Sequence, residues 1–210
     1  SDHPRLYNIV EEMKIASMLP AMPEIYIIDD PAPNAFAVGQ RPESAAIAVT
    51  SGLLNTLNRD ELQGVIAHEV AHIMNRDTLF MSMLGVMLGA IVMLSGVARR
   101  TLFWGGGNRR SRTSSSGGGQ AQVVIMIVGL VLMIIAPILA RLIYLAASRK
   151  REYLADASAA IYTRYPDGLA AALEKISVSP IRMRKTSQVT APMYIINPIH
   201  KFKAGGDSLF

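Results

Sequence analysis

The sequence contains no cysteine among its 210 residues, which excludes disulfides, thiolate metal sites and cysteine nucleophiles. Charged residues are also scarce: they make up 18% of the chain, below the proportion of about a quarter found in soluble domains. Aromatic residues account for only 6%, although half of all residues are hydrophobic. The apolar excess is therefore aliphatic, and it favours a small domain joined to membrane segments over a single soluble domain.

Positive charge exceeds negative charge, with a formal net value of +5. Such a charge is compatible with nucleic-acid binding, but much of the arginine surplus lies beside hydrophobic runs, a placement that is typical of membrane flanks. We therefore expect no nucleic-acid partner. No signal peptide is visible after Ser1, and we expect the chain to be a fragment of a longer protein.

Two long apolar runs predict a transmembrane hairpin. Residues 78–98 and 121–147 are each long enough to cross a bilayer as a helix, and Pro137 is expected to kink the second helix without preventing a span. Residues 99–120 between them are rich in glycine, serine and arginine and predict a flexible, solvated loop. If both helices were buried in a soluble core, too few residues would remain to cover them. We therefore expect them to lie in the lipid bilayer.

The flanking regions predict a small domain that contains both helices and strands. Residues 6–18 have apolar side chains at helical spacing. A second helix is expected to begin at Asn58, with Glu61 as its reciprocal capping partner. Three short segments are interpreted as neighbouring strands of a small antiparallel sheet: 25–28, 34–38 and 45–50. The predicted fold is mainly α with this sheet, and the hairpin separates its two parts, residues 1–77 and 148–210.

The helix predicted from Asn58 contains the pattern H-E-V-A-H between His68 and His72. Because the two histidines are four residues apart, their imidazoles share one helix face and can bind one ion. Zinc accepts neutral imidazole nitrogen, and a catalytic zinc site needs three protein ligands plus an open position for water. Glu69 lies beside the pair, where it can accept a proton from that water. We predict one Zn²⁺ per chain, bound by His68 and His72, with Glu69 as the catalytic base.

A later acidic pair supplies the expected third ligand. Glu152 and Asp156 are also four residues apart, so their carboxylates point to the same side of a helix. We predict that Glu152 is the third zinc ligand and that Asp156 accepts the outer N–H of one ligating histidine, which fixes the tautomer of that ring. The resulting domain would be a zincin-like α+β catalytic domain. The alternative is a solvated helix face with arginine and lysine neighbours.

Three segments together resemble the HtpX family of membrane zinc peptidases, which is related to the CAAX prenyl endopeptidases. They are N-A-F-A from Asn34 to Ala37, N-R-D-E-L-Q-G-V-I-A-H-E-V-A-H from Asn58 to His72, and S-R-K-R-E-Y-L-A-D from Ser148 to Asp156. The resemblance covers nearly the whole chain. It implies a multi-pass endopeptidase of the bacterial inner membrane whose site faces the cytoplasm. It also implies a role in protein quality control under stress, through cleavage of misfolded or damaged membrane proteins.

The chain departs from the pattern of this family at two places. Family members carry two hydrophobic helices before the region where this chain starts. They also carry a His-Pro element beyond the region where it stops, whose histidine is associated with stabilisation of the transition state. His200 is followed by Lys201 rather than proline, so we do not transfer that role to it. We expect His200 and His3 to be solvated.

The predicted sheet suggests how a protein substrate would bind. An extended substrate can pair with an exposed sheet edge, and we expect that edge to be the strand that contains Ala45, Ala46, Ile47, Ala48 and Val49. The sequence is equally compatible with a purely structural role for this strand, in which it offers no edge to a substrate.

Helix lengths of about 10 Å from His72 to Leu79 and roughly 8 Å from Ala147 to Glu152 predict a metal close to the membrane surface. Membrane proteins are therefore the expected substrates.

Two other functions are compatible with these residues. A prenyl-protein endopeptidase would need an enclosed chamber, for which two spans are few. A membrane scaffold or chaperone that uses zinc only to stay folded would normally close all four zinc positions with protein ligands, so Glu69 beside three candidate ligands favours the enzyme. Arginines lie on both sides of the predicted hairpin, so the positive-inside rule does not decide the orientation. The cytoplasmic placement follows from the resemblance.

Overall fold

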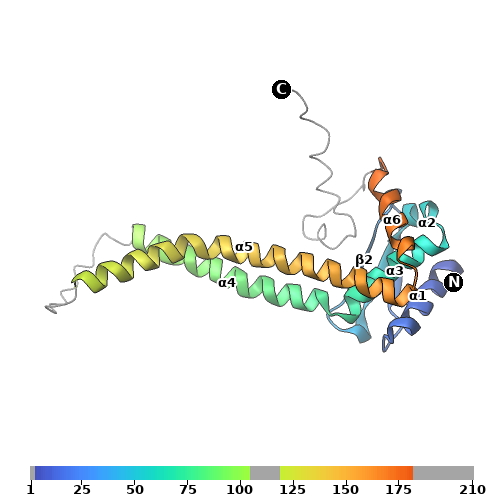
Figure 1. Ribbon diagram of the computed structural model, residues 1–210, viewed down its shortest axis with the longest axis horizontal. Coiled ribbons are helices and arrows are strands. Elements are labelled where there is room, and N and C mark those ends of the chain that lie inside the picture. Colours follow the sequence, from blue (N-terminus) through green and yellow to red (C-terminus); the bar gives the residue numbers. More distant parts are fainter. Residues whose placement is uncertain (1–2, 105–118, 182–210) are drawn as a thin grey trace, which may run out of the picture. The chain divides into compact units, whose positions relative to one another are not determined.

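A computed structural model describes residues 3–104 and 119–181 of the chain (Figure 1). Its elements in chain order are α1 (Pro4–Ser17), β1 (Glu24–Ile28), β2 (Ala35–Val38), η1 (Pro42–Ser44), β3 (Ala46–Thr50), α2 (Ser51–Thr56), α3 (Arg59–Met74), α4 (Asp77–Trp104), α5 (Gly119–Thr163) and α6 (Pro166–Val178). The chain divides into two compact units. The first comprises Ser1–Leu79 and Arg151–Phe210, and the second comprises Phe80–Lys150.

The sheet is mixed, so the prediction of an antiparallel sheet was wrong. Its strand order is β1-β3-β2, in which β3 runs parallel to β1 and antiparallel to β2. From Ile47 to Thr50 every residue of β3 is buried. An unbroken buried run of this kind is typical of a central strand, because both faces of such a strand are covered.

The position of β3 also overturns the predicted substrate edge. Both sides of the β3 backbone are paired with neighbouring strands, so this strand has no edge to offer a substrate. The five residues assigned to substrate binding lie at or within this central strand: Ala45, Ala46, Ile47, Ala48 and Val49. Their assignment was wrong because three short strands in sequence do not reveal which strand lies in the middle.

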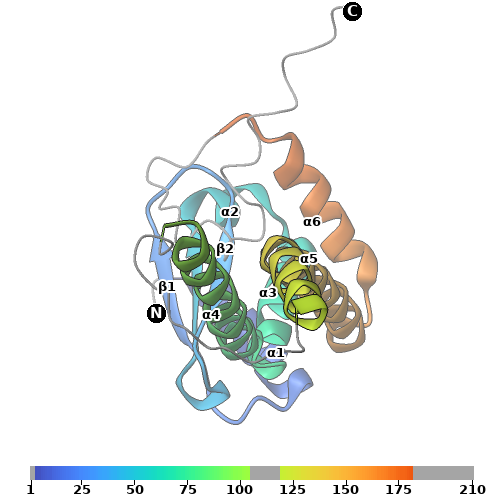
Figure 2. The ribbon, with the colours of Figure 1, turned by 90° about the vertical axis from the view of Figure 1, so that its left-hand side faces the viewer.

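Helix α3 is the centre of the first unit. It packs against α1, α6 and β2, and Figure 2 shows it between the sheet and α6. The core consists of fully buried aliphatic side chains from all of these layers, including Ile9, Ile47, Val65, Ile66 and Ile176. Burying a side chain of this size contributes about 1.5–3 kcal/mol, so the core holds α3 firmly in place.

A capping box that was predicted from the sequence stabilises the start of α3. The side chain of Asn58 accepts a hydrogen bond from the N–H of Glu61, and the Glu61 carboxylate accepts one from the N–H of Asn58, which confirms the capping box. Glu61 also lies 2.7 Å from Lys175 of α6. The two helices approach closely here, since a Cβ added to Gly64 would lie 2.6 Å from the backbone nitrogen of Leu169.

Among the described residues, one helix is long and apolar enough to cross a membrane, and most of it lies in the second unit. Residues Asp77–Val97 of α4 have a mean hydropathy of 2.1, and none of the apolar window is buried. Helix α5 contains Pro137, as expected. The ends of the predicted loop are helical, because α4 continues to Trp104 and α5 begins at Gly119. Its middle, residues 105–118, lies outside the described residues.

Candidate metal centre

Two histidines from the C-terminal half of α3 face one another. The Nε2 atoms of His68 and His72 are 3.0 Å apart, and the rings meet edge to face with their centroids 4.6 Å apart. Helical spacing brings the two side chains to one face, and the surrounding core buries His68. Both rings therefore present a nitrogen to the same point.

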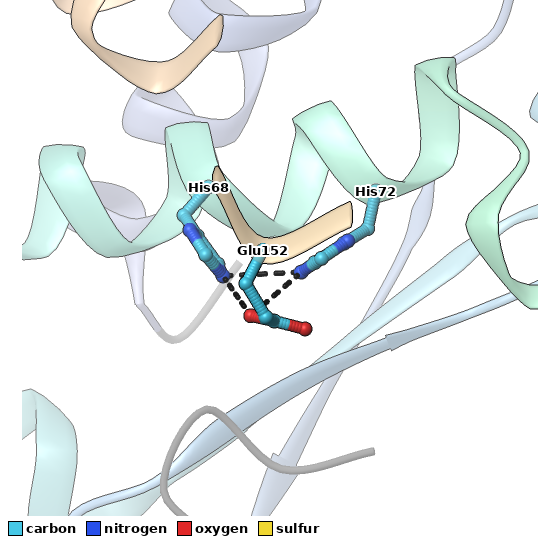
Figure 3. Close-up of side chains that lie close together, drawn as sticks. All are labelled: His68, His72 and Glu152. Carbon is cyan, nitrogen blue, oxygen red and sulfur yellow. Dashed lines mark hydrogen bonds and ion pairs between the residues drawn. The ribbon is translucent and has the colours of Figure 1, made fainter. Parts of the chain in front are cut away.

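Glu152 of α5 completes a group of three possible ligands. Its Oε2 lies 3.6 Å from Nε2 of His68 and 3.8 Å from Nε2 of His72. Figure 3 draws these two contacts as dashed lines. One ligand atom from each residue lies within 4.8 Å of the others. The structure thus brings together the three residues that the sequence predicted as zinc ligands, although they come from two helices far apart in sequence.

The outer nitrogen of each histidine faces a carboxylate. Nδ1 of His68 is 2.9 Å from Oδ1 of Asp156, the partner expected from the sequence. Nδ1 of His72 is 2.7 Å from Oδ2 of Asp77. A carboxylate partner favours the proton on Nδ1 of a neutral imidazole, so the lone pair on Nε2 is available to a metal.

These distances and donor types fit zinc. With Zn–N bonds of about 2.0–2.1 Å, the ligand atoms of a tetrahedral site lie about 3.3 Å apart. The observed separations of 3.0, 3.6 and 3.8 Å bracket that value. Two neutral imidazoles, one carboxylate and an open fourth position form the donor set of a catalytic zinc site rather than that of a closed structural one.

The sequence interpretation missed Asp77. A continuous helix would place residues five positions apart about 140° apart around the axis, so the spacing from His72 to Asp77 gave no reason to pair them. Helix α3 instead ends at Met74, and Arg76 adopts a left-handed conformation with φ 54° before α4 begins. The single usable signal was an isolated acid at the start of an apolar run.

The charges around His68 favour a positive charge at the centre. Desolvation lowers the pKa of His68, but hydrogen bonds to Asp156 and Glu152 and the charge on Glu69 outweigh it and raise the pKa to about 10. The same contact with His68 is the main cause that lowers the pKa of Glu152, against the effect of burial. A proton on His68 or a divalent cation can supply the positive charge that these carboxylates favour.

Glu69 is buried directly beside the ligands, with 2% of its surface exposed. Desolvation raises the pKa of its carboxyl group, and the charges on His68 and His72 and a hydrogen bond from the backbone N–H of Ala37 only partly offset that effect. A raised pKa makes the carboxylate a better proton acceptor, which suits a general base next to a metal site. Of the two histidines dismissed from the sequence, His3 is exposed and His200 lies outside the described residues.

Comparisons with known proteins agree with this site. The model of peptidase family M48 matches residues 1–201. A protein named Protease HtpX homolog from Dictyoglomus turgidum is 46% identical over 198 residues, which cover 94% of this chain and 62% of that protein. Proteins of the same name are 48% identical in Caldanaerobacter subterraneus, with 93% and 64% covered, and 49% identical in Listeria monocytogenes, with 99% and 68% covered.

The chain spans a little under two thirds of the length of the first two relatives. No solved structure matches it. The family match includes both helices that carry the His-His-Glu group, and the resemblance inferred from the three motifs is confirmed. The chain belongs to peptidase family M48.

Proposed function

We propose that this chain forms the catalytic part of a zinc-dependent endopeptidase of the membrane. The observation that carries the proposal is the buried carboxylate of Glu69 beside a group of three possible zinc ligands. A zinc site that only stabilised the fold would not need a buried proton acceptor at its side. The names of the relatives as proteases support the same activity.

Each residue of the centre has its own role in peptide hydrolysis. His68, His72 and Glu152 would hold zinc, which supplies the Lewis acidity that acidifies water and polarises a carbonyl. Glu69 accepts the proton of the attacking water and later delivers it to the leaving amine. Asp77 accepts the Nδ1–H of His72, and Asp156 lies 2.9 Å from Nδ1 of His68, so a carboxylate orients each ring.

The substrate would bind along β2 rather than β3. Within the described part of the chain, β2 has a partner strand on one side only. The N–H of Thr50 donates to the carbonyl of Asn34, and antiparallel pairing alternates, so the backbone groups of Ala35 and Ala37 face away from β3. The N–H of Ala37 reaches Glu69. This edge therefore borders the catalytic base. Because the N–H groups of Ala35 and Ala37 already donate to Asn34 Oδ1 and to Glu69, an extended substrate could pair with the outward carbonyl groups of these two residues.

We further propose that residues 78–98 and 121–147 span the bilayer as a hairpin. The apolar span in α4 supports this, and so do exposed aliphatic side chains in the second segment, including Ile134, Ile138 and Leu142. Exposure of such side chains to water is unfavourable, whereas their contact with lipid is favourable. Residues 1–77 and 148–210 then form the catalytic domain, facing the bacterial cytoplasm.

Misfolded or damaged membrane proteins are the proposed substrates. Helix α5 carries Glu152 and includes the second apolar segment, and α4, which contains the first, begins at Asp77 soon after α3 ends at Met74. Release of the chain from membranes by carbonate would contradict the hairpin. A membrane-impermeant label at Ser115 that reacts from the cytoplasmic side would contradict the orientation alone.

The activity is tested with Glu69→Gln in the detergent-purified chain. The variant should keep stoichiometric zinc by mass spectrometry and lose casein cleavage by about 100- to 10,000-fold, because an amide cannot accept the proton. Glu174→Gln, at an exposed position on α6, is the matched control and should cleave normally. If Glu69→Gln keeps its zinc and still cleaves casein at the normal rate, the proposed peptidase activity is contradicted, and a non-catalytic scaffold becomes the better explanation.

A further inference from the structure

The corner between α3 and α4 is a strained feature in the first unit. Helix α3 ends at Met74 and α4 begins at Asp77, and Arg76 between them has φ 54°. The N–H of Arg76 donates to the carbonyl of Ile73, which closes the last turn. A residue with a side chain adopts this left-handed conformation at a cost that glycine avoids. Neighbouring interactions must therefore compensate for it.

The corner brings Asp77 into contact with His72. It turns the start of α4 back toward the metal centre, so that Oδ2 of Asp77 lies 2.7 Å from Nδ1 of His72. Only 8% of the Asp77 side chain is exposed. A buried carboxylate is costly unless charged or hydrogen-bonded partners surround it, so a second partner is needed for its other oxygen.

Arg151 supplies that partner. Its Nη1 lies 3.1 Å from Oδ1 of Asp77, so the two oxygens of the carboxylate face different groups. Arg151 also directly precedes the third candidate ligand, Glu152, in α5. The contacts therefore form a continuous chain from His72 through Asp77 to the turn of α5 that carries Glu152.

The two histidines are thus both connected to α5, by different routes. His68 meets α5 directly, through Asp156. His72 lies 3.8 Å from Glu152 of the same helix, and a second route joins it to α5 through Asp77 and Arg151. Without the second route, the position of Glu152 relative to His72 in the metal-free protein would depend on the packing of α5 and on the contact of 3.8 Å between the two side chains.

We propose that Arg151 and Asp77 are positioning residues that set the geometry of the metal centre. Arg151 holds Asp77, Asp77 orients the ring of His72, and the pair fixes the distance between His72 and Glu152. The inference rests on the part of the proposed function that assigns zinc to this centre. It does not depend on peptidase activity, because all of its measurements are of metal binding.

The test measures zinc affinity by chelator competition in the full chain carrying Glu69→Gln. Asp77→Asn should weaken binding by about 10- to 100-fold, the usual effect of removing a partner of a ligand. Arg151→Gln should weaken it by about tenfold, at the low end of that range, whereas Arg149→Gln, which removes an exposed charge from the same helix, should change nothing. With cobalt in place of zinc, the visible absorption bands should move in Arg151→Gln and not in Arg149→Gln.

A double mutant separates positioning from general stability. Because Arg151 acts through Asp77, its substitution should add almost nothing in the Asp77→Asn background. Arg151→Lys keeps the charge but lacks the guanidinium fork, so it should bind zinc more tightly than Arg151→Gln does. This variant tests the inference if Asp77→Asn does not fold.

The inference is overturned if Arg151→Gln and Arg149→Gln bind zinc equally, or if the effects of Asp77→Asn and Arg151→Gln simply add. Either result leaves the proposed zinc peptidase intact. Failure of the unsubstituted chain to bind zinc overturns both proposals.

Discussion

The two helices that form the metal centre differ in how deeply their side chains are buried. On α3, 5% of the His68 side chain and 18% of the His72 side chain are exposed. On α5, 56% of the Glu152 side chain and 48% of the Asp156 side chain are exposed. The side chains of α3 are held by the core, which also contains Val65 and Ile66 of the same helix.

This difference indicates that the two sides of the centre are stabilised by different forces. Packing fixes the α3 side whether or not a metal is bound. The α5 side is oriented by charge contacts with the histidines, which solvent weakens at exposed positions. Substitutions on α5 should therefore change metal affinity more than folding, and substitutions near α3 should change both.

The largest expected effect on metal affinity is at Glu152. Glu152→Gln should weaken zinc binding by more than about 100-fold, beyond the range typical of an outer partner, because a neutral amide is a poor ligand. The thermal unfolding of the metal-free protein should hardly change, since the side chain is half exposed. Zinc content after dialysis against a weak chelator measures the effect.

Asp156→Asn provides the graded control, with an expected loss of about 10- to 100-fold. Stoichiometric zinc in Glu152→Gln after dialysis would exclude Glu152 as a ligand.

A pair of prolines distinguishes the edge strand from the central strand. Ile47→Pro removes a donor from the middle of the sheet and should destabilise the fold by about 3 kcal/mol or more. Ala37→Pro, on the outward side of β2, breaks no ladder hydrogen bond, so it should keep its zinc and cost only about 1–3 kcal/mol for a lost hydrogen bond to buried Glu69. It should reduce cleavage, because the N–H that reaches Glu69 is lost. Chemical denaturation and casein digestion test both. A stable Ile47→Pro variant would contradict the central position of β3.

Proton release on zinc binding tests the electrostatics of the α3 side. The pKa of His68 is raised from 6.5 to about 10, so in the metal-free protein its proton contributes stability that is present below pH 6.5 and is lost as pH rises through about 10. Zinc must displace that proton. Zinc affinity should therefore rise with pH, by about tenfold per unit well below pH 10, and binding at pH 8 should release about one proton.

Calorimetry in buffers with different ionisation enthalpies measures the number of protons released. In Asp156→Asn the number at pH 8 should fall, because a contact that raises the pKa of His68 is removed. Equal release in both proteins would show that Asp156 does not stabilise the charge on His68.

The smallest expected effect is at the corner after α3. Arg76→Val should destabilise the fold by about 1–2 kcal/mol relative to Arg76→Gly, since a β-branched side chain is strongly disfavoured at positive φ. Zinc affinity should follow the same order, because the corner places Asp77 against His72. Thermal unfolding of the two variants makes the comparison. Equal stability would mean that the corner is not held in the left-handed conformation in solution.

Most of the centre was predictable because its residues follow helical periodicity. His68 and His72 share a face of one helix, and Glu152 and Asp156 share a face of another, so each pair was recognisable from its spacing alone. The capping box at Asn58 is equally local, since its two hydrogen bonds join residues three positions apart. The strand order was not predictable, because apolar character marks a strand as buried without naming its neighbours.

The sequence by itself determined the ligand types, the pairing of residues on each helix and the apolar segments, because these depend on side-chain chemistry and on the repeat of the helix. Only the tertiary structure decided that β3 is central, that β2 borders Glu69 and that Asp77 meets both His72 and Arg151. These contacts join residues whose distance depends on how the whole unit packs. No local pattern required the left-handed conformation of Arg76. Because of it, Asp77 faces His72 instead of pointing away from it, as helical spacing would have predicted.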